Sequence, residues 1–150
     1  MRFLLVCFLL ALATVSVSAG NLVVGSYVDN DKAEMTVLTY ASEKPDPTCK
    51  FSGTQLLLGY AQNVTTWKQD VEAQNAFAGA GIYLTNGFTK VSAGFTGNYV
   101  NSDCDDGFRM GYYGAVDLMV SKCWFVQAKY NQIWDADLGK GWQIGAGIKF

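Results

Sequence analysis

Residues 75–100 read NAFAGAGIYLTNGFTKVSAGFTGNYV, and this stretch carries the clearest strand pattern of the chain. Large apolar residues alternate with small or polar residues through most of it, which is the pattern of a β-strand with two different faces. Asn86-Gly87 lies near the middle, and this dipeptide favours a two-residue hairpin turn. Such a turn pairs Ile82 with Val91 on a largely apolar face. The stretch therefore predicts an antiparallel hairpin.

The same alternation continues through the rest of the chain. In the last three predicted strands one set of side chains is apolar and uncharged, and the other set is rich in glycine and amides. Together with three weaker segments near the start, this predicts an all-β fold of eight antiparallel strands connected up and down. The predicted strands are 21–28, 33–41, 53–63, 75–85, 88–100, 108–120, 124–134 and 141–150.

The polarity of the two sets indicates the solvent on each side. Charged residues make up only 16% of the chain, which is low for a soluble domain. The set with small and polar residues suits the crowded interior of an eight-stranded barrel, and the apolar set carries aromatic residues towards the strand ends, as membrane barrels do. We therefore expect a transmembrane β-barrel. A secreted soluble barrel, similar to a lipocalin, that binds a small apolar ligand is the alternative.

The first nineteen residues have the pattern of a secretory signal peptide. Arg2 precedes an apolar run over residues 3–13, and Val17-Ser18-Ala19 is a small-residue cleavage site. Cleavage after Ala19 leaves one domain, residues 20–150, with ten basic and thirteen acidic side chains. This balance gives no reason to expect nucleic acid as a partner. We expect the lipid bilayer of the outer membrane instead, because a charge-poor exported chain without a long apolar helix can enter a bilayer as a closed barrel.

Connection lengths predict the orientation of the barrel. With both ends of the mature chain in the periplasm, two of the three predicted periplasmic turns are tight and three of the four predicted outer loops are longer, as outer-membrane barrels prefer. The predicted turns are 42–52, 86–87 and 121–123. The predicted outer loops are 29–32, 64–74, 101–107 and 135–140.

The chain ends with GWQIGAGIKF, residues 141–150, in which apolar residues alternate up to Phe150. This ending resembles the closing strand of small outer-membrane barrels, and the mature chain as a whole resembles the OmpX/Ail type of porin-like cell-surface barrel. The resemblance implies that Phe150, Ile148 and Trp142 belong to a signal read by the barrel-insertion machinery. It also implies a structural role, or contact with a surface ligand through the outer loops.

The sequence contains no histidine, which excludes nucleophilic catalysis by serine-histidine or cysteine-histidine pairs. We expect no enzyme activity, cofactor or metal, although a lipid-modifying barrel enzyme that uses carboxylates or a hydroxyl remains a weaker alternative. Five charges are expected inside the barrel, where they neutralise one another. A pore is the functional interpretation of the same residues, but eight strands normally enclose a filled interior. These charges are Lys90, Arg109, Asp117, Lys129 and Lys149.

Three cysteines remain after removal of the signal, and export makes disulfides possible. Cys104 is expected in an outer loop and Cys123 in a periplasmic turn, so one strand length separates them, and a disulfide cannot span that distance. Cys49 lies in the predicted turn 42–52, which could fold across the barrel end. The prediction is a bond between Cys49 and Cys123, if any bond forms, with Cys104 free.

Overall fold

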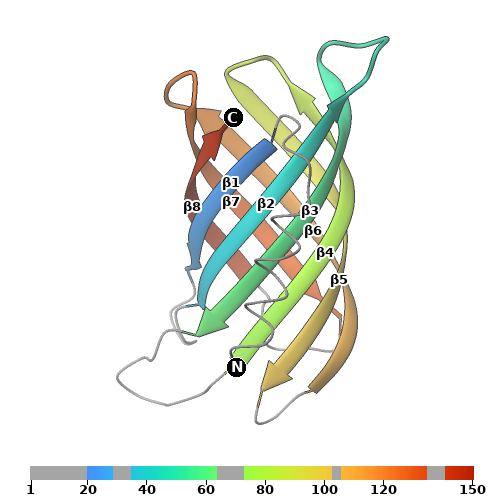
Figure 1. The fold of residues 1–150 in the computed structure, drawn as a ribbon, viewed down its shortest axis with the longest axis vertical. Helices are drawn as coiled ribbons and strands as arrows, with labels where there is room; N and C mark the ends of the chain where they lie inside the picture. Colours follow the sequence, from blue (N-terminus) through green and yellow to red (C-terminus); the bar gives the residue numbers. More distant parts are fainter. Residues whose placement is uncertain (1–19, 29–34, 64–72, 103–105, 135–140) are drawn as a thin grey trace.

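The computed structural model describes residues 20–28, 35–63, 73–102, 106–134 and 141–150. Eight strands pair in chain order, each antiparallel to its neighbours, and β1 pairs with β8 to close the barrel (Figure 1). The predicted fold class is confirmed. The strands are β1 (Gly20–Tyr27), β2 (Met35–Pro45), β3 (Ser52–Asn63), β4 (Ala73–Thr85), β5 (Thr89–Ser102), β6 (Asp106–Met119), β7 (Trp124–Ile133) and β8 (Gly141–Lys149).

Gly20 and Phe150 close the seam of the barrel. The amide of each donates a hydrogen bond to the carbonyl of the other, both at 3.0 Å. The Phe150 ring stacks on Tyr40 of β2, with ring centroids 6.3 Å apart. The last residue of the quoted ending is therefore held by backbone and side-chain contacts to the first two strands.

Three of the seven connections lie at the same end of the barrel as Gly20 and Phe150, the upper end in Figure 1, and each has six residues or fewer. This end is called the turn end below, and the opposite end is called the loop end. The turns are residues 46–51, 86–88 and 120–123. Most of the loop end falls outside the described residues, and so do the predicted signal peptide and Cys104. The described part of the chain includes no helix with the length and apolar character needed to cross a membrane.

The predicted register of the β4–β5 hairpin is wrong by two residues. Ile82 pairs with Ala93, not with Val91, and Thr85 pairs with Lys90 across a four-residue loop. The Asn86 side chain explains the longer loop, because its Oδ1 accepts hydrogen bonds from the Phe88 and Thr89 amides at 3.0 and 2.7 Å. These bonds take the place of a two-residue turn. Because side chains alternate with period two, a shift of two residues leaves every side chain on its predicted face.

The first turn also differs from the prediction. β2 continues in register with β3 as far as Pro45, which pairs with Gly53, so the turn covers 46–51 and not 42–52. Within this turn the Thr48 hydroxyl and amide both donate to Asp46 Oδ1. These bonds, the hydroxyl first, hold the pKa of the Asp46 carboxyl below its usual range. The extension of β2 brings Glu43 into the strand and onto the inward face.

Candidate functional site: the barrel interior

The outward face of the described strands is apolar and forms a belt around the barrel. Ile82, Phe95, Val116 and Ile144 are among its exposed side chains. Aromatic side chains stand towards both ends of this belt, as predicted. Tyr130 and Trp142 contact edge to face across β7 and β8, with ring centroids 5.4 Å apart. Exposed aromatics at the two ends include Phe51, Phe88, Trp124 and Phe150 at the turn end and Tyr99, Phe108, Tyr112 and Trp142 nearer the loop end.

Inside the barrel, large aromatic side chains lie across glycines of the neighbouring strand. Phe77 pairs with Gly59 and Phe125 pairs with Gly147. A methyl group at Gly59 would stand 1.9 Å from the Phe77 ring, and one at Gly147 would stand 2.2 Å from the Phe125 ring. The inward glycines therefore leave space that the aromatic rings occupy. This explains why the inward-facing set of residues is rich in glycine.

A cluster of charges lies inside the turn end. Lys90 Nζ is 2.5 Å from Glu43 Oε1 and 2.8 Å from Asp117 Oδ2. Lys90 and Asp117 are directly paired across β5 and β6, whereas Glu43 reaches Lys90 across the lumen from β2. One buried ammonium thus bridges two buried carboxylates, and we call these three residues the Lys90 cluster.

Further donors complete the hydrogen bonding of both carboxylates. Gln127 Nε2 donates to Asp117 Oδ1 at 2.7 Å, and the Asn21 amide donates to Glu43 Oε1. Lys149 Nζ lies 3.8 Å from Glu43 Oε2 and is half exposed. Buried carboxylates are stable when they are paired and hydrogen-bonded in this way. Three of the predicted lumen charges, Lys90, Asp117 and Lys149, therefore lie in one network with Glu43.

Lys129 has a different environment. Its Nζ lies 4.7 Å from the centre of the Phe77 ring and 5.4 Å from that of Tyr113. The residue is only 2% exposed, and Nζ has no hydrogen-bond partner among the described residues. Arg109 lies nearer the loop end, where its guanidinium donates to the Phe108 carbonyl at 3.1 Å. Of the predicted lumen charges, Lys129 is thus one on which Asp117 acts without a hydrogen bond to its ammonium.

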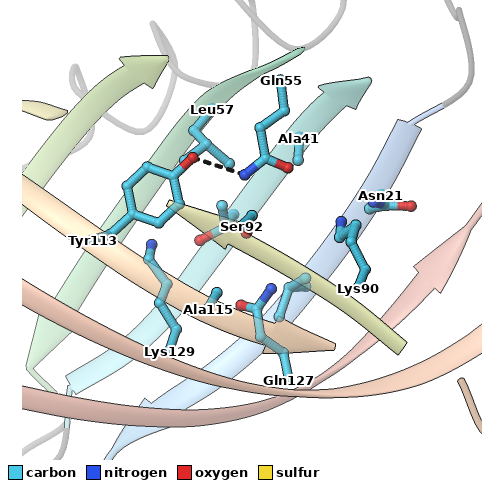
Figure 2. A pocket seen from close by; sticks show the side chains of 12 residues that line it. Asn21, Ala41, Gln55, Leu57, Lys90, Ser92, Tyr113, Ala115, Gln127 and Lys129 are labelled. Carbon is cyan, nitrogen blue, oxygen red and sulfur yellow. Dashed lines mark hydrogen bonds between the residues drawn. The ribbon is translucent and has the colours of Figure 1, made fainter. Parts of the chain in front are cut away.

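Two cavities follow the barrel axis from the turn end. The outer one opens between the three turns and has a volume of about 640 Å³. The inner one, shown in Figure 2, has a volume of only about 10 Å³ and is lined by side chains from across the barrel, including Gln55, Tyr113 and Lys129. A volume of this size holds about one water-sized particle. Around this cavity the described side chains therefore fill the barrel and leave no room there for the apolar ligand of a lipocalin-like protein.

The predicted disulfide is not formed. Cys49 and Cys123 are exposed free thiols in two turns of the same end. Because β2 extends to Pro45, the turn that carries Cys49 is too short to fold across the mouth. The turns 46–51 and 120–123 are half a barrel apart in strand order. Eight tilted strands about 4.8 Å apart give a diameter of about 16 Å, well beyond the 7 Å limit between Cα atoms of a disulfide.

Sequence reasoning missed Glu43, which anchors the Lys90 cluster. The signal was present, because Val37, Thr39, Ala41 and Glu43 continue one alternating set. The nearby Pro45 and Pro47 favoured an early turn instead, since proline is rare in strands. Pro45 is tolerated as the last residue of β2.

No protein-family model matches the chain, and no curated protein matches it. Several solved structures match the chain. The outer membrane protein Ail of Yersinia pestis, determined in a phospholipid bilayer nanodisc, has a TM-score of 0.59 and 15% identity, covering 88% of this chain and 99% of Ail. The chain has the fold of a small eight-stranded outer-membrane β-barrel.

Two further structures support the same fold. The N-terminal barrel domain of Pseudomonas aeruginosa OprF has a TM-score of 0.59 and 14% identity, covering 88% of this chain and 97% of that domain. A de novo designed transmembrane β-barrel has a TM-score of 0.62 and 12% identity, covering 88% of this chain and 95% of the design. A designed barrel with this score shows that the likeness is one of architecture, because the design shares no ancestry with the chain.

Proposed function

We propose that the protein is an integral outer-membrane β-barrel, exported by a cleaved signal at residues 1–19 and folded as one domain over residues 20–150. One observation carries the proposal. The face in contact with the surroundings is apolar, while the charges of the described strands lie mainly inside. A soluble barrel has the opposite polarity, whereas lipid favours this one.

We propose a structural or surface-interaction role without catalysis. The two carboxylates of the Lys90 cluster are already engaged by ammonium and amide donors, and the centre of the barrel is closely packed. This arrangement favours a rigid support over an active site. The turn end then faces the periplasm, because its connections are short. The loop end faces outwards, where the three longer of its four connections, residues 28–34, 64–72 and 134–140, would contact surface ligands.

Cell fractionation tests the location. The protein is expected in outer membranes, and an unboiled sample is expected to migrate differently from a boiled sample on a denaturing gel, because a closed barrel resists the detergent. Purified protein refolded from urea is expected to show the same shift only when detergent or lipid is present. Recovery of a folded soluble protein from the periplasm or medium would contradict the proposal.

The terminal strand is proposed to be the part that the insertion machinery reads, with Phe150, Ile148 and Trp142 on its outward face. The Phe150→Asp variant is expected to reduce insertion in cells, because it removes the contact with Tyr40 and places a charge at the seam. The control is Ile148→Leu, which keeps an apolar side chain. Refolding both variants in detergent separates the two roles. A Phe150→Asp variant that refolds in detergent but fails in cells indicates a recognition defect.

A further inference from the structure

The inner cavity of Figure 2 brings hydrogen-bond donors together, and one of them, Lys129, has no hydrogen-bond acceptor among the described residues. Lys129 Nζ is buried and has no hydrogen-bond partner among the described residues. Figure 2 shows its side chain reaching towards the ring of Tyr113, whose hydroxyl accepts a 2.7 Å hydrogen bond from Gln55 Nε2. The proton of that hydroxyl is left to donate elsewhere. Ser92 and Thr39 bring further hydroxyl groups to the same cavity.

The aromatic rings beside Lys129 do not replace an anion. A ring face stabilises an ammonium by the electrostatic field of its π-electrons, but this effect is smaller than the cost of removing a charge from water. The rings also accept no strong hydrogen bonds from the ammonium. The ammonium form of Lys129 would therefore be stabilised by a further negatively charged or strongly accepting neighbour.

The two carboxylates of the Lys90 cluster do not hydrogen-bond to Lys129, although the charge of Asp117 acts on it. Both already contact Lys90, and each accepts a further hydrogen bond from an amide side chain. The charged residues that line the two cavities are five lysines against these two carboxylates. The lining of the barrel at this end therefore has an excess of positive charge. Its most deeply buried member is Lys129.

We infer that the inner cavity binds one monatomic anion, of the chloride or bromide class, held by Lys129 together with the hydroxyl of Tyr113. The volume of about 10 Å³ limits the ligand to a single heavy atom. Phosphate, sulfate and carboxylates are therefore excluded by size. The anion would neutralise the buried ammonium and accept hydrogen bonds from the donors that the protein leaves unused. The site makes the stability of the barrel depend on the anion, and it adds to the surface role proposed above.

Bromide makes the anion visible by its anomalous X-ray scattering. The mature protein is refolded in sodium bromide, so that the anion can enter before the barrel closes, and is then crystallised. One anomalous peak is expected in contact with Lys129 Nζ. The peak is expected to be lost in Lys129→Met, which keeps an unbranched side chain of nearly the same length and removes the charge. It is expected to remain in Lys149→Met, which removes a lysine already paired with Glu43.

A solution measurement accompanies the crystals. Thermal unfolding midpoints are compared in chloride and in gluconate at equal ionic strength, because gluconate is too large for the cavity. The wild type and Lys149→Met are expected to unfold at a higher temperature in chloride, with an effect that saturates as chloride increases. Lys129→Met is expected to show no difference between the salts. Equal midpoints for the wild type, a chloride effect that persists in Lys129→Met, or a water in place of the bromide peak would each overturn the inference.

Discussion

Neighbouring residues of a single strand face two different environments, the packed barrel interior and the outside of the barrel. In β6, Asp117 is 2% exposed inside the barrel, while Val116 and Leu118 on either side are 40% and 44% exposed outside. The inward residue is fixed by specific partners, Lys90 and Gln127. The outward residues need only be apolar. We therefore expect the interior to be sensitive to the identity and size of a side chain, and the exterior to be sensitive to its polarity.

The largest effect is expected from Lys90→Met. This change leaves two buried carboxylates, Glu43 and Asp117, without the ammonium that lies between them. Removing one partner of a buried ion pair costs about 3–5 kcal/mol of unfolding free energy. Urea titration of the protein in lipid vesicles measures the loss.

A neutral version of the same cluster provides the control. The combined change Glu43→Gln, Lys90→Met and Asp117→Asn removes all three charges and is expected to recover most of the lost stability, because no buried charge remains unpaired. A triple variant as unstable as Lys90→Met would show that the loss comes from packing and not from charge.

A charge on the outward face is expected to have the next largest effect. Phe95 lies near the middle of β5 on the outward face, paired with Ala80 and Tyr112. Phe95→Arg should lower the free energy of unfolding in vesicles by about 2–4 kcal/mol, because arginine at the bilayer midplane loses its hydration. Phe88→Arg is the matched control at the turn end, where the cost should be about 0–1 kcal/mol. Equal costs at both positions would argue against a membrane around the belt.

Adding a single methyl group to a glycine on each face tests how sensitive that face is to side-chain size. Gly94 and Gly81 pair beneath the Tyr113 ring, and a methyl group at Gly94 would stand 2.2 Å from the Ala80 carbonyl oxygen. Gly94→Ala should cost about 1–3 kcal/mol of unfolding free energy, as overpacking does. Gly114 faces outwards with nothing within 4 Å, so Gly114→Ala should be neutral or slightly stabilising. The urea midpoints of the two variants measure the contrast, and similar midpoints would contradict it.

The alternating pattern predicts the strand count, the order and the two faces, because lipid and lumen impose opposite polarities on alternate residues. It does not predict details that depend on a particular partner. The hairpin loop at Asn86 depends on side-chain hydrogen bonds to Phe88 and Thr89. The position of Glu43 depends on Lys90, which lies 47 residues further along the chain. Whether an inward lysine of the described strands contacts a carboxylate depends on the register of all eight strands together.

The smallest effect is expected from the cysteines, which belong to neither face. Cys49 and Cys123 lie in exposed turns, where water surrounds them and no lumen partner fixes them. The Ser52 side chain and the Phe51 amide hydrogen-bond to the Cys49 sulfur, and these bonds lower the pKa of the thiol. A serine can occupy the same turn position, so Cys49→Ser with Cys123→Ser should change the unfolding free energy by less than about 0.5 kcal/mol, as exposed substitutions usually do. Urea titration with and without reductant measures the change. The contrary result would be a wild type that is more stable when oxidised, with a Cys49–Cys123 bond found by peptide mapping. That result would contradict the separation of these two turns across the barrel mouth.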